Sequence, residues 1–300
     1  MTLDARRTLR SIEARANATR LTRLNGGRMI PRMHRSLVVL ALAVLVVAAS
    51  PSAQWLHNPT EGLPRLADGR PNLAAPPPKA SDNHPDLSGV WQAQGDECDA
   101  DNSVTAGLRR PKYFVSAAGC RSADLPMLPW AQELFRERRA GNSKDLPISS
   151  CKPAATPMRD AFPLPFKIVQ TPRLIIFLYE QDTTFRQVFL DSRALPADPQ
   201  PSWLGYSVGH WEADELVVET IGFQDRGWLD SLGHPYSDAL RMTERFRRLN
   251  VGRLDIHVTY NDPKTYSKPI EFTQPHNLLA DSDLIEFFCT ENERDRPHMK

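Results

Sequence analysis

The 300-residue sequence has no excess of charge of one sign. Its 37 lysines and arginines almost balance its 36 aspartates and glutamates, and the formal net charge is +1. A chain with balanced charge has no electrostatic reason to bind nucleic acid or an anionic membrane. We therefore expect no nucleic-acid partner and no membrane partner for the folded protein.

The chain also lacks a hydrophobic run long enough to cross a bilayer comfortably. The apolar run at residues 37–49 has only 13 residues, follows His34 and Arg35, and precedes small residues and Pro51. This order is typical of a secretory signal peptide, with a membrane anchor as the alternative. No cysteine follows the run, so a lipid-modified terminus is not indicated. We expect a periplasmic or secreted protein with no membrane contact after signal cleavage.

Cysteine is scarce, and its spacing fits no zinc module and contains no Cys-x-x-Cys. Four cysteines in an exported chain favour disulfides, with buried free thiols as the alternative. Three pairings are possible. We favour Cys98 with Cys120, both in an irregular segment, and Cys151 with Cys289, which would tie the entry of the core to its last strand.

Helical patterns are rare, and one segment near residues 129–140 carries them. An α/β-hydrolase would need helices between its strands, so the Gly-x-Ser-x-Gly letters at residues 205–209 lack the context of a nucleophile elbow. The helix has a proline in its first turn, an apolar face and a charged end, which we expect to be a solvated face. These residues are Pro129; Trp130, Leu134 and Phe135; and Arg136, Arg138 and Arg139, before Gly141.

Strand-like runs on short connections make up most of the rest. They occupy residues 166–170, 174–180, 184–191, 206–212, 216–223, 240–249, 253–260, 270–273 and 284–289, after a first strand entered through Gly89. Consecutive strands on short links are antiparallel neighbours, and a sheet of nine or ten strands tends to close. We predict an all-β fold, an antiparallel meander closed into a calycin-like barrel with one flanking helix. A two-sheet sandwich is the alternative.

The chain divides into three parts on composition. Residues 1–53 hold an N-terminal extension and the signal peptide, and residues 54–86 are a proline-rich linker or a strap over the surface. Residues 87–297 form the single barrel domain.

Period-two alternation places a glutamate among apolar residues. Glu244 shares a face with Leu240, Met242 and Phe246, whereas the alternate positions carry Arg241, Arg245 and Arg247. A buried carboxylate is costly unless it is paired or protonated. Glu244 is therefore either a structural partner of Arg186 or Tyr206, or a catalytic acid or base beside His210 or His234.

For two further strands, at residues 216–222 and 253–260, the question is which side chains point into the barrel. Either face of residues 216–222 could be interior, so Glu219 is either a second carboxylate in the cavity or a solvated residue. In the strand at residues 253–260 the apolar residues point inward, and Asp255 and His257 point outward, where they can pair with the arginines.

The long loop at residues 222–238 should lie at the mouth of the barrel, and long ordered loops are often functional. Its candidate ligand-binding residues are Asp225, Trp228, Asp230 and Tyr236, and it also carries the candidate catalytic residue His234. Arg186 and Tyr206 are further candidate ligand-binding residues on the strands. A lid held by Asx turns is the alternative. A metal site at His210, Glu212, Asp230 and His234 is not expected, because the spacing fits no known metal motif.

Several segments resemble a family of exported bacterial proteins frequent in Acidobacteria. They are residues 165–172, 205–212, 216–220, 233–237 and 243–247. The resemblance implies export into a Gram-negative-type periplasm and assigns no reaction. In addition, Gly89-Val90-Trp91 is similar to the Gly-x-Trp that opens the first strand of lipocalins.

These observations leave three functions open. The first is binding of a small, partly apolar molecule inside the barrel, under the loop at residues 223–238. The second is a metal-free acid–base enzyme, such as a lyase, an isomerase or a glycoside-cleaving enzyme, that uses Glu244 with His210 or His234. The third is a structural module. No cofactor is expected, and the chain should be a monomer or a homodimer.

Overall fold

The computed structural model describes residues 59–94, 125–142, 144–160 and 164–289. The predicted signal peptide at residues 37–49 and the predicted pair Cys98 and Cys120 lie outside these ranges.

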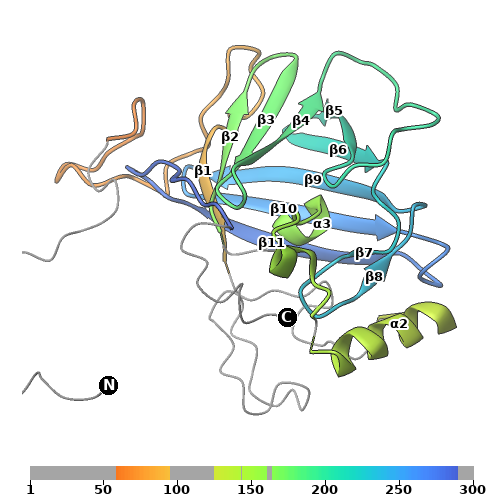
Figure 1. Cartoon of the computed structure of the whole chain (residues 1–300). Helices are drawn as coiled ribbons and strands as arrows, with labels where there is room; N and C mark the ends of the chain where they lie inside the picture. The colour runs from red at the N-terminus through yellow and green to blue at the C-terminus, as the bar shows by residue number, and fades with distance from the viewer. Residues whose placement is uncertain (1–58, 95–124, 143, 161–163, 290–300) are drawn as a thin grey trace, which may run out of the picture. The chain divides into compact units, whose positions relative to one another are not determined.

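Strands dominate the described chain, and they close into a barrel (Figure 1). Around the barrel the order is β1-β11-β10-β9-β6-β5-β4-β3-β2, and β2 pairs with β1 to complete the ring. The predicted all-β barrel is therefore confirmed. The barrel strands are β1 (Gly89–Ala93), β2 (Phe166–Gln170), β3 (Leu174–Tyr179), β4 (Thr184–Phe189), β5 (Tyr206–Glu212), β6 (Glu215–Ile221), β9 (Arg241–Asn250), β10 (Arg253–Asn261) and β11 (Ile270–Leu278); β7 (Gly227–Trp228) and β8 (Pro235–Tyr236) form a separate two-stranded sheet.

One pair of neighbours departs from the predicted antiparallel meander. Strands β4 and β5 are parallel, with Val188 opposite Ser207. A closed ring of nine strands cannot alternate in direction throughout, so one neighbouring pair has to be parallel. The connection at residues 190–205 runs back along the barrel to allow this, and Gly209 lets the strands approach, since a Cβ there would lie 2.9 Å from Leu190 Cδ2.

A second prediction is wrong at the end of the chain. Residues 284–289 do not form a barrel strand and make only an isolated bridge between Phe287 and Gln181. The strand before them, β11, already has β1 and β10 on its two sides. The closed barrel therefore offers no free edge to a further strand.

The flanking helix α2 (Pro129–Ala140) is confirmed with the bounds the sequence predicts. Two short helical segments follow it, η2 (Pro147–Ser150) and α3 (Thr156–Asp160). The disulfide between Cys151 and Cys289 is also confirmed. No helix in the described ranges is both long enough and apolar enough to cross a membrane.

Side chains fill the interior of the barrel. The alternation predicted for β9 and β10 is confirmed, because their inward residues are almost fully buried. Contacts also cross the lumen: the rings of Phe177 on β3 and Phe246 on β9 lie 5.5 Å apart. A barrel of about eight strands is just wide enough for side chains to fill it. The interior is thus a packed core. The inward residues of these two strands are Met242, Glu244, Phe246, Leu254, Ile256, Val258 and Tyr260.

The two ends of the barrel differ. At one end, which we call the turn end, short turns join β2 to β3, β5 to β6, and β9 to β10. Residues 59–86 run against this end as a strap, with hydrogen bonds from Val251 N to Ala75 O and from Gly252 N to Leu73 O. At the opposite end, the loop end, lie the long connection from β6 to β9, helix α3 and helix α2 (Figure 1).

Candidate functional site

The buried carboxylate predicted from alternation lies in the lumen and is fully paired. Glu244 has no exposed surface, and its Oε1 accepts a hydrogen bond from Arg186 Nη1 at 3.0 Å. Its Oε2 accepts a second bond from Arg186 Nη2. Arg186 also donates to Ser207 Oγ at 3.0 Å and to Thr220 Oγ1 at 2.7 Å. Both carboxylate oxygens are therefore engaged by one guanidinium, which is the arrangement of the structural alternative.

The same hydrogen-bond network shows which face of β6 points into the lumen. Thr220 lies in the lumen with Leu216 and Val218, so Glu219 lies on the outer side, half-buried and opposite Thr243 of β9. The second carboxylate of the proposed cavity is thus not in the lumen.

The candidate residues of β5 also lie outside. Ser207 points into the lumen, so alternation turns Tyr206 and His210 outward. His210 is exposed, with Nε2 3.2 Å from Glu212 Oε1. The hydroxyl of Tyr206 accepts a hydrogen bond from Arg193 Nη1 at 3.1 Å. The structure therefore does not bring His210 to Glu244, and the predicted catalytic pair of these two residues is wrong.

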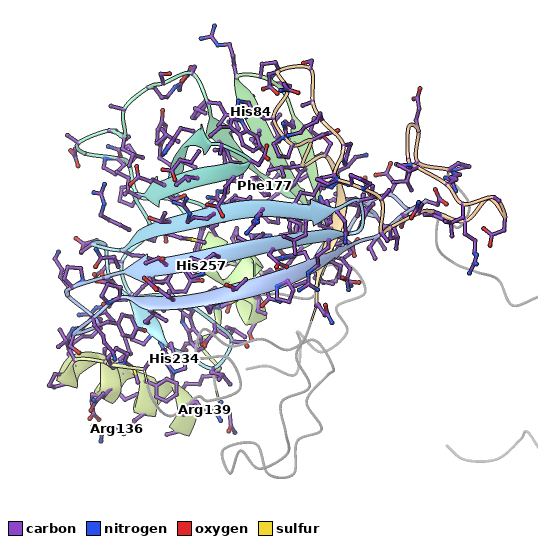
Figure 2. The ribbon with its side chains drawn as sticks, turned by 180° about the vertical axis from the view of Figure 1, so that it is seen from behind. His84, Arg136, Arg139, Phe177, His234 and His257 are labelled. Carbon is purple, nitrogen blue, oxygen red and sulfur yellow. A yellow bond between two sulfur atoms is a disulfide. The ribbon has the colours of Figure 1, made fainter. Side chains whose placement is uncertain are left out.

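The outer face of β9 and β10 is polar, as predicted, but its partners differ. His257 lies opposite Arg245 and its Nδ1 is 3.1 Å from Thr273 Oγ1 (Figure 2). Arg245 instead donates to Glu212 and Glu215. Arg245 thus pairs with the hairpin of β5 and β6.

The loop between β6 and β9 buries an aspartate–histidine pair. Asp230 Oδ1 accepts hydrogen bonds from the backbone N–H groups of Leu232, Gly233 and His234, and its Oδ2 lies 2.6 Å from His234 Nδ1. His234 has no exposed surface, and its ring stacks on Phe135 of α2 at 4.4 Å (Figure 2). Its Nε2 has no hydrogen-bond partner among the described residues. The pair holds the loop, as in the alternative of a lid tied by Asx turns.

Arg138 fastens helix α2 to this loop. Its guanidinium lies 4.4 Å from the centroid of the Trp228 ring and donates to the carbonyls of Arg226, Gly227 and Gly233. Burial lowers the pKa of Arg138 to about 10, which leaves it charged at neutral pH. The expectation of a solvated arginine face is wrong at this position, whereas Arg136 is exposed (Figure 2). Helical spacing carried the signal, because Arg138 lies three residues after Phe135.

Tyr236 packs behind the same loop. Its ring covers Gly227, where a Cβ would lie 1.8 Å from Tyr236 Cζ, so only glycine fits at that position. Burial raises the pKa of Tyr236 above its usual range. The hydroxyl has no partner within the described residues. Tyr236 therefore supports the site from behind, and no ligand reaches it in this arrangement.

The cavity at the loop end lies outside the barrel. A groove of about 510 Å³ opens between the end of α2, the segment at residues 144–152 and the loop at residues 224–228; we call it the α2 groove. Two of the predicted ligand-binding residues, Asp225 and Trp228, line it. Trp203 and the lysines at its rim were not predicted. Its lining residues are Leu134, Glu137, Arg138, Gly141, Lys144, Asp145, Pro147, Ser150, Lys152, Trp203, Gln224, Asp225, Arg226, Gly227 and Trp228.

The walls of the α2 groove are anchored to the rest of the domain. Arg138 holds the helix, and the disulfide from Cys151 to Cys289 holds the segment that carries Ser150 and Lys152. Lys144 and Lys152 are exposed and form no ion pair with the described residues. The groove thus has two tryptophans in its lining, of which Trp203 is the more exposed, and two exposed lysines.

A smaller cavity of about 330 Å³ lies at the turn end. It is enclosed by the strap and the turn between β2 and β3, and no aromatic side chain lines it. Small-molecule sites combine apolar and aromatic lining with a few polar groups. The α2 groove fits this description, and the cavity at the turn end does not.

The described residues contain no group of three or more histidine, cysteine, aspartate or glutamate side chains placed to hold a metal ion. His210 and Glu212 lie on the outer face of β5, away from the buried pair Asp230 and His234.

No family model, no curated protein and no solved structure matches this chain.

Proposed function

We propose that the protein is an exported binding protein that holds a small, partly apolar molecule in the α2 groove. The observation that carries this proposal is the groove itself, of about 510 Å³, lined by Trp203, Trp228, Lys144 and Lys152. Its volume falls within the range of about 300–1,000 Å³ that is usual for small-molecule sites. The lumen is not the ligand site in this proposal, because side chains fill it.

The lining indicates the chemistry of the ligand. Trp203 is half-buried and presents rigid apolar surface, whereas Trp228 is buried, with its ring backed by Arg138, and forms part of the wall. Lys144 and Lys152 supply positive charge at the rim, where an anionic group would gain charge-assisted hydrogen bonds. We infer a ligand with a flat apolar part and an acidic group.

Two features support export. The apolar run at residues 37–49 follows basic residues in the order of a signal peptide. The pair Cys151–Cys289 is of the kind that persists in oxidising compartments such as the periplasm.

A ligand screen tests the proposal. The full chain is screened by thermal shift and tryptophan fluorescence against aromatic and alicyclic acids, with the matching amides as comparison. We expect acids to bind, and Trp203→Ala or Lys152→Ala to weaken binding at least about tenfold, the effect of losing about 1.4 kcal/mol. The control is Lys268→Ala, an exposed lysine outside the groove. Acids that bind both groove variants as tightly as the unchanged protein would contradict the proposal.

A second candidate is an acid–base enzyme, and the buried pair of Asp230 and His234 favours it. A carboxylate on Nδ1 orients an imidazole and leaves Nε2 to exchange a proton. Phe135 covers that ring, so substrate would reach it only if α2 moved. Glu244 takes no part, since Arg186 occupies both of its oxygens. Turnover of a screened ligand that survives in His234→Gln would rule this candidate out.

A further inference from the structure

The outer surface of β3 is apolar where an exposed strand is normally polar. In β3 the outward residues Leu174, Ile176 and Leu178 alternate with the buried Ile175, Phe177 and Tyr179, so the strand is apolar on both faces. Strands with continuous apolar sequence are typically covered on both sides. The outward positions of β9, in contrast, carry Arg241, Thr243, Arg245 and Arg247.

Neighbouring segments extend this surface. Phe185 on β4 is directly opposite Leu178 and is 59% exposed. The segment after β11 lies alongside β2 and the end of β3. Lys167 on β2, which is opposite Leu178 on β3, forms an ion pair with Asp283, and Phe287 forms an isolated bridge with Gln181. We call this surface the β3 face. Its members are Val169, Ile176, Leu178, Phe185, Ile285, Phe287 and Phe288.

The area of the β3 face matches the apolar part of a protein interface. Phe185, Phe287 and Phe288 are 59%, 45% and 46% exposed, so together they present on the order of 300 Å². The aliphatic members bring the total to the size of the largest patches on monomers, about 300–600 Å². A stable interface buries about 800 Å² on each partner, of which roughly 450 Å² is apolar.

Charges at the two ends of the face are opposite in sign. Before β3, Arg173 is 81% exposed, and its only ion pair in the described chain is a loose one, 4.0 Å from Asp191. Beyond the other end of β3 lie Glu180 and the exposed Glu286. These ends are about 20 Å apart at the usual rise of a strand. A second copy turned by a two-fold axis through the middle of the face would set the acidic end of each copy against the basic end of the other.

We propose that the β3 face is a homodimer interface, in which two copies pack Phe185 and Leu178 at the centre and pair Arg173 with Glu286 of the second copy at each side. The acidic end argues against an anionic lipid surface as the occupant. No residue of the β3 face is among the lining residues of the α2 groove.

Sedimentation velocity of the full chain over a concentration series tests this assignment. We expect reversible dimers, and Phe185→Asp should weaken dimerisation at least about 30-fold, the effect of losing a central anchor. Leu249→Asp is the matched control, because Leu249 is 44% exposed on β9 outside the face. Circular dichroism confirms that both variants fold. A chain that stays monomeric, whether or not it binds phosphatidylglycerol vesicles, overturns the proposal, as does equal dimerisation of the two variants.

A charge exchange tests the two-fold arrangement independently of folding. Arg173→Glu alone and Glu286→Arg alone each place like charges together and should weaken the dimer. The double variant restores opposite charges across the interface and should recover dimerisation to within about threefold, because the pairs are exposed and individually weak. A double variant as weak as the sum of the two single variants overturns the arrangement.

Discussion

Arg248 at the turn end and Arg138 at the loop end are buried arginines that each donate to several backbone carbonyls, and they join different kinds of segment. At the turn end, Arg248 lies 4.9 Å from the centroid of Trp91 and donates to the carbonyls of Asp86, Ser88, Asn250 and Val251. At the loop end, Arg138 lies over Trp228 and donates to three loop carbonyls. Burial lowers the pKa of both side chains to about 10.

The difference lies in what each arginine joins. Arg248 ties a two-residue turn to the start of β1, segments that already contact one another through the strap. Arg138 joins a helix to a long loop, and the space left between them is the α2 groove. The cavity at the turn end has no aromatic lining, whereas the long connection at the loop end leaves a groove that contains two tryptophans.

The largest effect is expected in the lumen that both ends share. Glu244→Gln removes the charge that compensates Arg186 and should cost about 3–5 kcal/mol of the free energy of unfolding, the usual penalty for an unpaired buried charge. Urea unfolding measures it. Because the lumen supports both ends, the tryptophan signal and the far-ultraviolet signal should shift together.

The double variant Arg186→Met with Glu244→Leu is the control for this measurement. It removes both charges and should lie much closer to the unchanged protein than Glu244→Gln does. A stability unchanged by Glu244→Gln would mean that the ion pair does not hold the lumen together.

Replacing the two fastening arginines compares the ends directly. Arg138→Met and Arg248→Met each leave several buried carbonyls without a hydrogen-bond donor. Each should lower the free energy of unfolding by about 2–4 kcal/mol. Only Arg138→Met should also abolish binding of a groove ligand, which isothermal titration measures. The exposed Arg136→Met is the control and should change stability by less than about 0.5 kcal/mol. Loss of groove binding in Arg248→Met would erase the distinction between the ends.

High pH should act on the loop end through its buried phenols. Burial raises the pKa of Tyr236 and of Tyr266, so the folded protein keeps these protons when the unfolded chain releases them above pH 10. Stability is then lost as pH rises, by about 1.4 kcal/mol for each tyrosine and pH unit. Tyr236→Phe should be neutral at pH 7, because the hydroxyl has no partner in the described chain, and should unfold less readily above pH 10. An equal alkaline loss in Tyr236→Phe would assign the effect to other groups.

Alternation of apolar and polar residues in the sequence predicts which side chains fill the lumen, but it does not predict how the strands are ordered around the barrel. The inward row of β9 was predicted through Phe246, and the same period continues to the buried Arg248, for which no prediction was made. The parallel pair of β4 and β5 was missed because it follows from the number of strands in the closed ring and from no local pattern.

The candidate site was predicted only in part, for a different physical reason. The loop offered Asp225 and Trp228, and both line the groove. The opposite wall comes from α2 and residues 144–152, which lie about 70 to 100 residues earlier and are placed by Arg138 and the disulfide. No period in the sequence reports such a contact between distant segments.

The smallest loss of stability is expected from a change at the strap. This change tests whether the turn end affects the α2 groove at the opposite end of the barrel. A Cβ on Gly252 would lie 2.6 Å from Leu73 Cβ and 3.2 Å from Leu73 O, so Gly252→Ala must push the strap away. We expect a loss of about 1 kcal/mol and faster hydrogen exchange in residues 59–86, with groove binding unchanged. Gly141→Ala is the control for stability alone, since its nearest contact of 3.4 Å accepts a methyl group, whereas Gly141 itself lines the groove. If Gly252→Ala weakened groove binding, the strap would have to act through the whole barrel, and the two ends would form one cooperative unit.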